Sequence, residues 1–383
     1  MKEMLHILHL PKWYPHNEDP QLGIFIKKQI LAASEFHMQS VLYIRSVKKL
    51  PKPFIVEEVK AKNLLEITIY YQKPESRTKQ FIILKKLYSL GFKKIKNTIG
   101  PPDLLHVHNL VTPAIWANKY SKKRMIPWIL SEHWSGYTPR SGVFRAKMKW
   151  EKKLWKWYSE KAAVTIAVSE FLLDALKKNG IGTEHLVIPN VVEGDFIEIK
   201  RNDDEIRILN VSDMVDEVKN ISGLLLAFSI LVKEFPSTKL YLVGGGEDLE
   251  NLKTFVQDLG IQDQVYFYGR LANDQVLKLY HEIDFTVINS RVETFSVVAA
   301  ESLMAGKPVI STRSGGVQEF ITKDQGILIP VNNEEKLLDA LKTMRMSYAD
   351  FDPKTLSEYA KGKFSARSVG IRLTEVYESI LHD

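Results

Sequence analysis

Short apolar runs alternate with longer amphipathic segments along the whole chain. The apolar runs, rich in Val, Ile, Leu and aromatic residues, predict buried β-strands, and the segments between them carry apolar residues at helical spacing. In the first half we expect strands at Leu5–Leu10, Ser40–Arg45, Leu65–Tyr71, Leu104–Val107, Trp128–Ser131 and Val164–Val168. In the second half we expect them at Ile206–Val211, Lys239–Val243, Val265–Phe267, Phe285–Ile288, Val309–Thr312 and Gly326–Ile329. Strands that alternate with helices predict an α/β protein with mostly parallel sheets.

The expected helices lie between these strands, at Gly23–Phe36, about 79–96, Glu170–Lys178, Ser222–Phe235, Asp248–Leu259, Asp274–Glu282, Ser296–Ala305, Glu334–Met344 and Ser365–Leu381. The polar segment 194–205 is the expected linker between a Rossmann-like domain over residues 1–193 and a second one over 206–364. The last helix, within 365–383, is expected to pack back on the first domain. Ligands of such sheets bind outside the carboxyl ends of the strands, so two facing domains predict a site in the cleft between them.

Composition adds an asymmetry of charge. The 383 residues include no cysteine, which excludes disulfides and thiolate chemistry. Residues 1–193 hold 32 Lys and Arg against 16 Asp and Glu, whereas residues 194–383 hold 21 against 30. A basic half predicts an anionic partner. No nucleic-acid motif is visible, so an anionic membrane surface or a phosphorylated acceptor is favoured.

The sequence shows neither an apolar run of membrane-spanning length nor the pattern of a signal peptide. We therefore expect a cytoplasmic protein, and the basic first half favours peripheral contact with the inner face of the membrane.

The stretch Arg291–Glu301 is the most informative part of the chain. Two carboxylates, Glu293 and Glu301, stand eight positions apart around a predicted helix start. The first amides of a helix lack partners and the helix dipole makes that end positive, which suits a phosphate. Carboxylates on both sides could accept hydrogen bonds from hydroxyl groups, as binding of a nucleotide sugar requires. The alternative is an ordinary capped helix with two surface glutamates.

The longer run Val287–Glu319 resembles the signature of the retaining GT-B glycosyltransferases of family 4, and the resemblance extends across almost the whole chain. It implies two Rossmann-like domains facing across a cleft, the first binding an acceptor and the second a nucleotide sugar. It also implies transfer of a sugar from a nucleoside diphosphate to a hydroxyl, with retention of configuration and without a metal or other cofactor. The leaving phosphate oxygen would help to take the acceptor proton, so no protein nucleophile is needed.

The resemblance also implies roles for individual residues. Glu293 would bind hydroxyls of the donor sugar, Glu301 those of the ribose, and Lys219 the diphosphate. His133 would contact the transferred sugar, and with Glu293 and Lys219 it forms the expected catalytic set. The other expected donor-binding residues are Gly23, Gly245, Arg270, Leu271, Thr294, Phe295, Ser296 and Val297.

One position departs from the family pattern. An arginine is expected shortly after the strand Ile206–Val211, but Asp213 stands there. A carboxylate cannot replace a cation beside a phosphate, so another cation takes its place or the donor is handled differently. Arg270, Arg291 and Arg313 are the candidates.

Three more positions have a functional and a structural interpretation. His106 and His108 alternate on a predicted strand and would face one side, which permits metal ligation. Because no third ligand of suitable spacing follows, we favour structural histidines. Ser169 matches a family serine but can simply cap the following helix.

Two basic segments, 79–96 and 143–158, carry apolar residues at helical spacing. Such helices can lie on an anionic bilayer, or their apolar stripe packs on the core while the lysines face water. The residues of the second segment that can share one face are Phe144, Met148, Trp155 and Tyr158.

The sequence therefore favours a retaining glycosyltransferase that uses a nucleotide sugar and a saccharide or lipid-linked acceptor, in polysaccharide or glycolipid assembly. A glycosidase-like use of the two carboxylates is weaker, because the phosphate site at the helix start would then lack a purpose. The alternatives are an inactive or regulatory subunit that binds nucleotide sugars, which Asp213 motivates, and a nucleotide-sugar epimerase of similar architecture.

Overall fold

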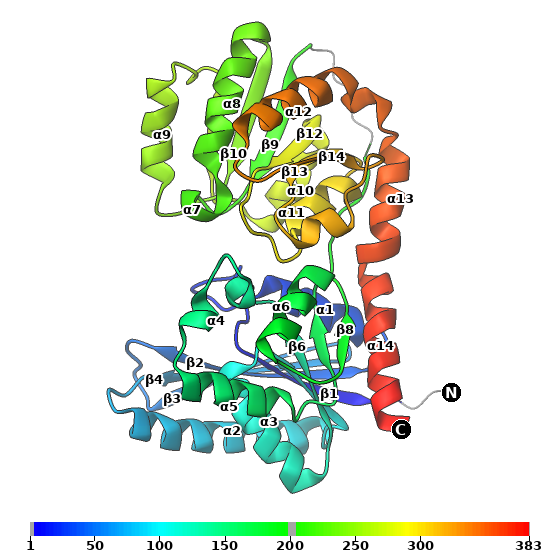
Figure 1. The fold of residues 1–383 in the computed structure, drawn as a ribbon. Helices are drawn as coiled ribbons and strands as arrows, with labels where there is room; N and C mark the ends of the chain where they lie inside the picture. The colour runs from blue at the N-terminus through cyan, green and yellow to red at the C-terminus, as the bar shows by residue number, and fades with distance from the viewer. Residues whose placement is uncertain (1–3, 198–203, 383) are drawn as a thin grey trace. The chain divides into compact units, whose positions relative to one another are not determined.

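The computed structural model describes residues 4–197 and 204–382, and the chain forms two compact units (Figure 1). The first unit comprises the residues up to Val191 together with those from Ala366 onward, and the second comprises Val192–Ser365. Part of the expected linker, residues 198–203, lies outside the described residues. Each unit has its own sheet with helices around it, which confirms the predicted α/β class.

The sheet of the first unit has the strand order β3-β4-β2-β1-β5-β6-β7-β8. Its neighbouring strands are parallel except β3 and β4, which form an antiparallel hairpin. The sequence pattern misses β3 and β8, because β3 is largely exposed and β8 is only three residues long. The strands are β1 (His6–Pro11), β2 (Met38–Val47), β3 (Phe54–Ala61), β4 (Leu64–Gln72), β5 (Leu104–His108), β6 (Trp128–Glu132), β7 (Thr165–Ala167) and β8 (His185–Val187).

Helices cover both faces of this sheet (Figure 1). α1 and α14 pack together on one face, where Ile7, Ala33 and Leu373 belong to one apolar cluster. α2 and α3 lie on the other face, and α5 packs beside α3. The helices are α1 (Ile24–Ser34), α2 (Arg77–Ile99), α3 (Val111–Arg124), α4 (Val143–Ala146), α5 (Lys149–Ser159), α6 (Glu170–Asn179) and α14 (Ala366–His382).

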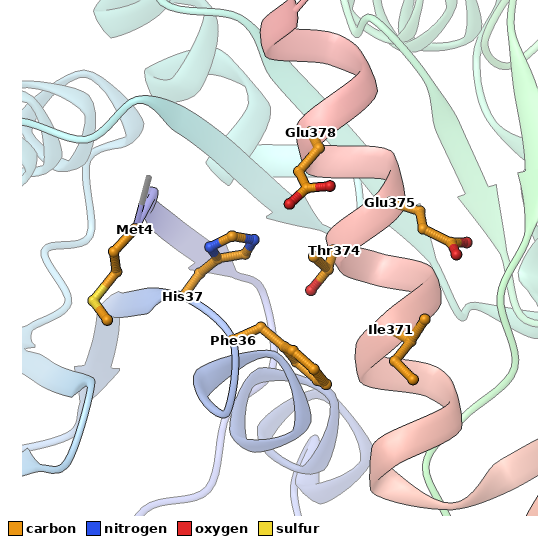
Figure 2. Close-up of a pocket in the computed structure, with 7 residues that line it drawn as sticks. All are labelled: Met4, Phe36, His37, Ile371, Thr374, Glu375 and Glu378. Carbon is orange, nitrogen blue, oxygen red and sulfur yellow. The ribbon is translucent and has the colours of Figure 1, made fainter. Parts of the chain in front are cut away.

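The contact between α1 and α14 depends on a glycine. A Cβ atom at Gly370 would lie 2.6 Å from the carbonyl oxygen of Ala32, so a larger residue would push the helices apart. Nearby, α14 borders a cavity of about 390 Å³ at the start of β1 (Figure 2). Thr374 and Glu378 of α14 point across it towards His37, and the described residues that line it include none of the expected site residues.

The second unit has an all-parallel sheet with the order β11-β10-β9-β12-β13-β14. The direction of winding reverses between β9 and β12, and in such sheets ligands bind at the carboxyl ends of the strands at this point. The strands are β9 (Ile206–Val211), β10 (Thr238–Val243), β11 (Val265–Gly269), β12 (Phe285–Ile288), β13 (Val309–Thr312) and β14 (Gly326–Ile329). The helices are α7 (Asp216–Lys219), α8 (Ile221–Glu234), α9 (Leu249–Asp258), α10 (Asn273–Glu282), α11 (Val297–Met304), α12 (Glu334–Ser347) and α13 (Pro353–Phe364).

Within the described residues, none of the helices carries an apolar stretch long enough to cross a bilayer.

Candidate functional site

Two loops meet where β9 and β12 end in the second unit. The loop after β9 carries the short helix α7, and the loop after β12 leads into α11. The Asn289 side-chain amide donates a hydrogen bond to the carbonyl oxygen of Asn220, with N and O 2.9 Å apart. The backbone N–H of Arg291 donates to the carbonyl oxygen of Val218 over 2.8 Å. These bonds fix the two loops against each other at the switch point of the sheet.

Lys219 and Glu293 form an ion pair across these loops. Nζ of Lys219 lies 2.6 Å from Oε1 of Glu293, and the two side chains are 23% and 14% exposed. Glu293 is held in turn by its backbone, which bonds to Ser314 and to Gly316 in the loop after β13. The structure therefore brings together two of the three residues expected to be catalytic.

Arg291 holds the short helix α7 in place. Its guanidinium donates to the carbonyl oxygens of Asp216 and Glu217, and Nη2 lies 2.6 Å from Oδ1 of Asn220. Nε donates to Oδ1 of Asn332 over 2.7 Å. Since these bonds occupy the guanidinium, Arg291 positions the backbone that carries Lys219 and does not fit the role of the missing phosphate-binding cation.

Arg270 supplies a cation beside the unexpected carboxylate. Nη2 of Arg270 lies 3.6 Å from Oδ1 of Asp213, and it also donates to the carbonyl oxygen of Gly245 over 3.4 Å. Both charged side chains are more than two-thirds exposed, so the pair can rearrange at little cost. The guanidinium and Asp213 thus face the same glycine-rich turn after β10.

This turn packs tightly against the loop after β9. A Cβ atom at Gly244 would lie 1.8 Å from the carbonyl oxygen of Ser212, and one at Gly246 would lie 2.4 Å from that of Met214. Gly245, the expected donor-binding glycine, would bring its Cβ to 3.0 Å from Cγ of Arg270. Only residues without a side chain allow the two loops to approach this closely.

The start of α11 stands beside Glu293. Thr294, Phe295 and Ser296 lead into the helix, which begins at Val297, one residue later than expected. Ser296 has φ of 75° and its side chain does not cap the helix. The amides of the first turn have no partner within the helix. The Phe295 side chain is buried, with ring contacts to Phe320 and Phe364, so it anchors the loop while its backbone remains at the helix start.

Glu301 lies inside the unit, on α11. Its side chain is buried, and the Tyr280 hydroxyl lies within donating distance of Oε2, at 3.4 Å, and of the carbonyl oxygen of Val298, at 3.2 Å. Burial and the neighbouring carboxylate raise the pKa of Tyr280 well above its usual value, so the phenol stays a donor. Leu271 packs in the apolar cluster that includes Tyr280. Glu293 and Glu301 thus differ in environment, the first partly open and paired with a cation, the second enclosed beside a phenol.

The remaining expected residues, Gly23 and His133, lie in the first unit. Gly23 has φ of 68°, and a Cβ atom there would lie 2.6 Å from the carbonyl oxygen of Trp13. The Phe25 ring contacts the His133 ring, with centroids 4.8 Å apart. Burial lowers the pKa of His133 to about 3, and the Asn190 side chain acts in the opposite direction. His133 is therefore a neutral imidazole at pH 7, with one hydrogen-bond donor and one acceptor nitrogen.

Three further histidines, His9, His106 and His108, form a buried cluster on the first sheet. His106 and His108 face the same side, as predicted, and their rings stack 4.1 Å apart. The sequence pattern missed His9, because it comes from a different strand; its Nδ1 lies 3.0 Å from Nε2 of His108. The three side chains could converge on one metal ion. However, His9 also bonds Gln39, and His106 bonds Ser131 and Tyr377, so most of the nitrogens already serve a hydrogen-bonded network. Nδ1 of His108 is buried and has no partner among the described residues.

Ser169 has the structural role that the sequence allowed. Its hydroxyl accepts a hydrogen bond from the backbone N–H of Leu172 and caps α6.

Comparison with known families accounts for most of the chain. A family model for glycosyl transferases group 1 matches residues 192–361, and a model for glycosyltransferase family 4 matches residues 60–196. The chain is 31% identical to the alpha-monoglucosyldiacylglycerol synthase of Streptococcus pneumoniae over 55% of its own length and 51% of that protein. It thus spans about half of this relative. It is 27% identical to the N-acetyl-alpha-D-glucosaminyl L-malate synthase of Bacillus anthracis over 73% of its length and 74% of that protein.

Solved structures share the fold. Sucrose-phosphate synthase from Thermosynechococcus elongatus superimposes with a TM-score of 0.77 at 18% identity, covering 98% of this chain and 99% of that one. Anabaena HepE in complex with UDP and glucose gives a TM-score of 0.72 at 16% identity, covering 98% and 100%. At this level of identity the likeness establishes the architecture alone. Together with the two family models, it shows that the chain belongs to the GT-B glycosyltransferases of family 4.

Proposed function

We propose that this protein transfers a sugar from a nucleoside-diphosphate sugar to a hydroxyl group of an acceptor, with retention of the anomeric configuration. The observation that carries the proposal is the ion pair between Lys219 and Glu293, 2.6 Å long, beside the start of α11. A cation, a hydrogen-bond acceptor and the backbone N–H groups at the start of α11 thus lie together at the switch point of one sheet. A diphosphate and a sugar need these three kinds of group.

The diphosphate would bind to the positive groups. The N–H groups at the start of α11 and the ammonium of Lys219 favour an anion there. As the bond from the sugar to the phosphate oxygen breaks, negative charge grows on that oxygen, and a fixed cation stabilises it. Arg291 keeps α7 in place, so Lys219 is positioned before the donor arrives.

The carboxylates would bind hydroxyl groups. Glu293 accepts hydrogen bonds from the donor sugar once Lys219 turns to the phosphate, and Glu301 is assigned to the ribose. The acceptor oxygen forms the new bond to the anomeric carbon on the same face from which the phosphate oxygen leaves. The acceptor proton passes to that phosphate oxygen, so the reaction needs no nucleophile from the protein. We expect it to need no metal or other cofactor.

The relatives support the class of substrates. HepE has been solved with UDP and glucose, and two relatives are named for the synthesis of a glucosyldiacylglycerol and of a glucosaminyl malate. We propose a saccharide or lipid-linked acceptor used in polysaccharide or glycolipid assembly, at the inner face of the membrane.

Asp213 favours a second candidate function, a subunit that binds nucleotide sugars without transferring them. A carboxylate near the phosphate site opposes the stabilisation of the leaving group. The neighbouring Arg270 offsets this charge, which is why we place transfer first.

The test uses purified protein and a panel of nucleotide sugars. A donor that binds the native state raises the melting temperature, and release of the nucleoside diphosphate then reports transfer or hydrolysis. We expect Glu293→Gln and Lys219→Ala to lower the rate by about a hundredfold or more. The ion pair of Lys342 and Glu234, on α12 and α8, offers matched controls, Lys342→Ala and Glu234→Gln, which should keep the wild-type rate. Donor binding without any turnover would favour the second candidate, and the absence of binding by all donors would refute both.

A further inference from the structure

The positive charge of the first unit is concentrated on three of its helices. α2 contains seven basic residues and no acidic residue, and α3 contains four basic residues and no acidic residue. α5 contains four basic residues and one acidic residue. α2 and α3 lie on the same face of the first sheet, and α5 packs beside α3 (Figure 1). We call the exposed surface of these three helices the basic face. It lies in a different unit from Lys219 and Glu293.

A pocket of about 490 Å³ opens on the basic face between α2 and α3. Its apolar residues are aromatic and are largely stacked in pairs, Tyr88 on Trp116 and Phe92 on Tyr120, with centroids 5.2 and 4.1 Å apart. Its basic lining residues are Lys85, Lys93, Lys96, Lys119, Lys123 and Arg124. The described residues that line the pocket include no carboxylate. A cationic rim around an aromatic interior fits a ligand that joins an anionic group to an apolar part.

One lining residue has an unused donor. Nε1 of Trp116 is buried and has no hydrogen-bond partner among the described residues, and the whole residue is only 4% exposed. The ammonium of Lys119 lies 4.6 Å from the centroid of the same ring. An anionic headgroup in the pocket would pair with this ammonium, which lines the pocket beside the Trp116 ring.

Next to this pocket, α5 exposes a stripe of large apolar residues. Trp150, Leu154 and Trp157 follow the spacing i, i+4 and i+7 and are therefore on one side of the helix. They are 60%, 41% and 42% exposed. A different side of the helix packs inward through Trp155, whose ring centroid lies 5.6 Å from that of Phe144. The expected common face with Met148 is wrong, because Met148 is at the N-cap of α5 and is exposed.

The stripe lies beside α3, the helix that forms one side of the pocket. Nζ of Lys122, on α3, lies 5.6 Å from the centroid of the Trp157 ring on α5, and Nζ of Lys161 lies at the same distance. Tryptophan beside lysine is the combination found where proteins meet the boundary between lipid headgroups and acyl chains.

We propose that the basic face docks on an anionic phospholipid bilayer, with the α5 stripe inserted at the headgroup level and one lipid phosphate held in the pocket between α2 and α3. The charge of the face selects the anionic surface. The row of exposed apolar side chains distinguishes a bilayer from a nucleic acid, because stacking with bases does not call for a leucine between two tryptophans. The inference does not rest on the proposed sugar transfer.

The experiment measures sedimentation of the full-length protein with vesicles. Vesicles of phosphatidylglycerol mixed with phosphatidylcholine should bind the protein, and pure phosphatidylcholine vesicles should not. Binding should weaken as salt rises from about 0.05 to about 0.5 M, because the charges are exposed. Tryptophan emission should also shift to shorter wavelength when anionic vesicles are added, since two tryptophans leave water.

Two groups of variants locate the contact. We expect the triple change Trp150→Ser, Leu154→Ser, Trp157→Ser and the triple change Lys93→Gln, Lys96→Gln, Lys123→Gln each to weaken vesicle binding about tenfold or more. The apolar control is Leu226→Ser with Ile230→Ser, an exposed pair on α8 that is 43% and 50% exposed. The charge control is Lys233→Gln, Lys253→Gln, Lys336→Gln in the second unit. Both controls should bind vesicles like the wild type, and circular dichroism verifies that every variant is folded.

Several outcomes would overturn the proposal. The proposal is wrong if the wild type does not bind anionic vesicles, or if both triple variants bind them as strongly as the wild type. The pocket could bind inorganic phosphate or a single-stranded oligonucleotide, with loss in the lysine variant, while vesicles are not bound; the site would then serve a soluble anion. Transfer to a soluble acceptor is measured separately, so failure of docking and failure of the proposed function remain distinct results.

Discussion

Arg270 faces Asp213 across the glycine-rich turn of the second unit, with Nη2 3.6 Å from Oδ1. The family pattern places an arginine where Asp213 stands, and the structure restores a cation at that place from a different strand end. Arg270 follows β11, whereas Asp213 follows β9. The positive charge expected near a donor phosphate is thus supplied by Arg270, but this guanidinium is paired with the carboxylate of Asp213.

This relationship predicts opposite effects for the two partners. Asp213→Asn frees the guanidinium and should tighten binding of UDP about two- to fivefold, whereas Arg270→Ala leaves a carboxylate near the phosphate and should weaken binding about fivefold. Effects of this size suit an exposed pair, which is worth about 1 kcal/mol or less. Calorimetric titration of each variant with UDP measures both. The Lys253–Glu250 pair on α9 provides controls, and equal effects of the same sign would contradict the assignment.

Arg291 leads to a prediction about preorganisation. Lysine keeps the charge but cannot make the fork of bonds to Asp216, Glu217, Asn220 and Asn332. We expect Arg291→Lys to destabilise the second unit by about 2 kcal/mol, from loss of hydrogen bonds. Amide hydrogen exchange should accelerate in α7 more than in α12, and donor binding should weaken because Lys219 is no longer held. Unchanged protection of α7 would mean that the guanidinium is dispensable there.

The sequence predicts the strands of both sheets well because most are continuous apolar runs between turns. It also points to Glu293, through its place before a predicted helix and through a family pattern, and to Lys219 through the family pattern alone. The contact between the two residues, 74 positions apart, is visible only in the fold. The sequence fails where partners come from elements distant in the chain. The role of Arg291 depends on carbonyl groups of α7, and backbone carbonyls leave no mark in a sequence. The pairing of Asp213 with Arg270 is hidden for the same reason, since it follows from the close packing of Gly244 on Ser212.

The basic helices show a second limit. Periodicity correctly marks segment 143–158 as amphipathic, yet it cannot say which side faces the core. α5 carries aromatic residues on more than one side, and Trp155 packs inward while Trp150 and Trp157 remain exposed. Which stripe is buried depends on Phe144 in α4 and Tyr137 in the 3-10 helix Ser135–Tyr137, which become partners of Trp155 only in the folded unit.

The buried histidines predict that acid unfolds the first unit before the second. Burial lowers the pKa of His9 to about 4 and of His133 to about 3, and also lowers those of His106 and His108. An unfolded histidine titrates near 6.5, so below that pH the unfolded state binds more protons and stability falls until the folded pKa is reached. The loss should therefore begin at about pH 6.5 and run to about pH 4 for His9 and to about pH 3 for His133.

Fluorescence can separate the two units in this experiment. All seven tryptophans precede residue 191, so their emission reports the first unit, whereas circular dichroism reports both. We expect the fluorescence transition at higher pH than the remaining dichroism change. His9→Gln should shift the fluorescence transition to lower pH relative to His185→Gln, a partly buried control in the same unit. Coincident transitions with no shift would show that the histidine network does not set acid stability.

Glu132 predicts the opposite dependence on pH. Its carboxyl group is buried on β6, and burial raises its pKa to about 7, although hydrogen bonds from the Leu110 N–H and the Tyr137 hydroxyl to Oε1 oppose the shift. An unfolded glutamate has a pKa near 4.5, so between about pH 4.5 and 7 the folded state binds the extra proton. Stability from this group is therefore lost as pH rises through that window, and the full loss is present above pH 7.

Replacing Glu132 with glutamine tests the predicted loss of stability, because glutamine is neutral and keeps an acceptor for the Leu110 N–H and the Tyr137 hydroxyl. Relative to the wild type, Glu132→Gln should gain stability between pH 5 and pH 8, by up to about 3 kcal/mol for a shift of this size. Urea unfolding followed by tryptophan fluorescence at both pH values measures the difference. Each variant is compared with the wild type at the same pH, so the contribution of the histidines to the free energy of unfolding cancels in the difference. Glu160→Gln, at the exposed end of α5, should show no such change. If Glu132→Gln has the same effect at pH 5 and pH 8, the carboxyl group does not take up its proton in the folded state within this range.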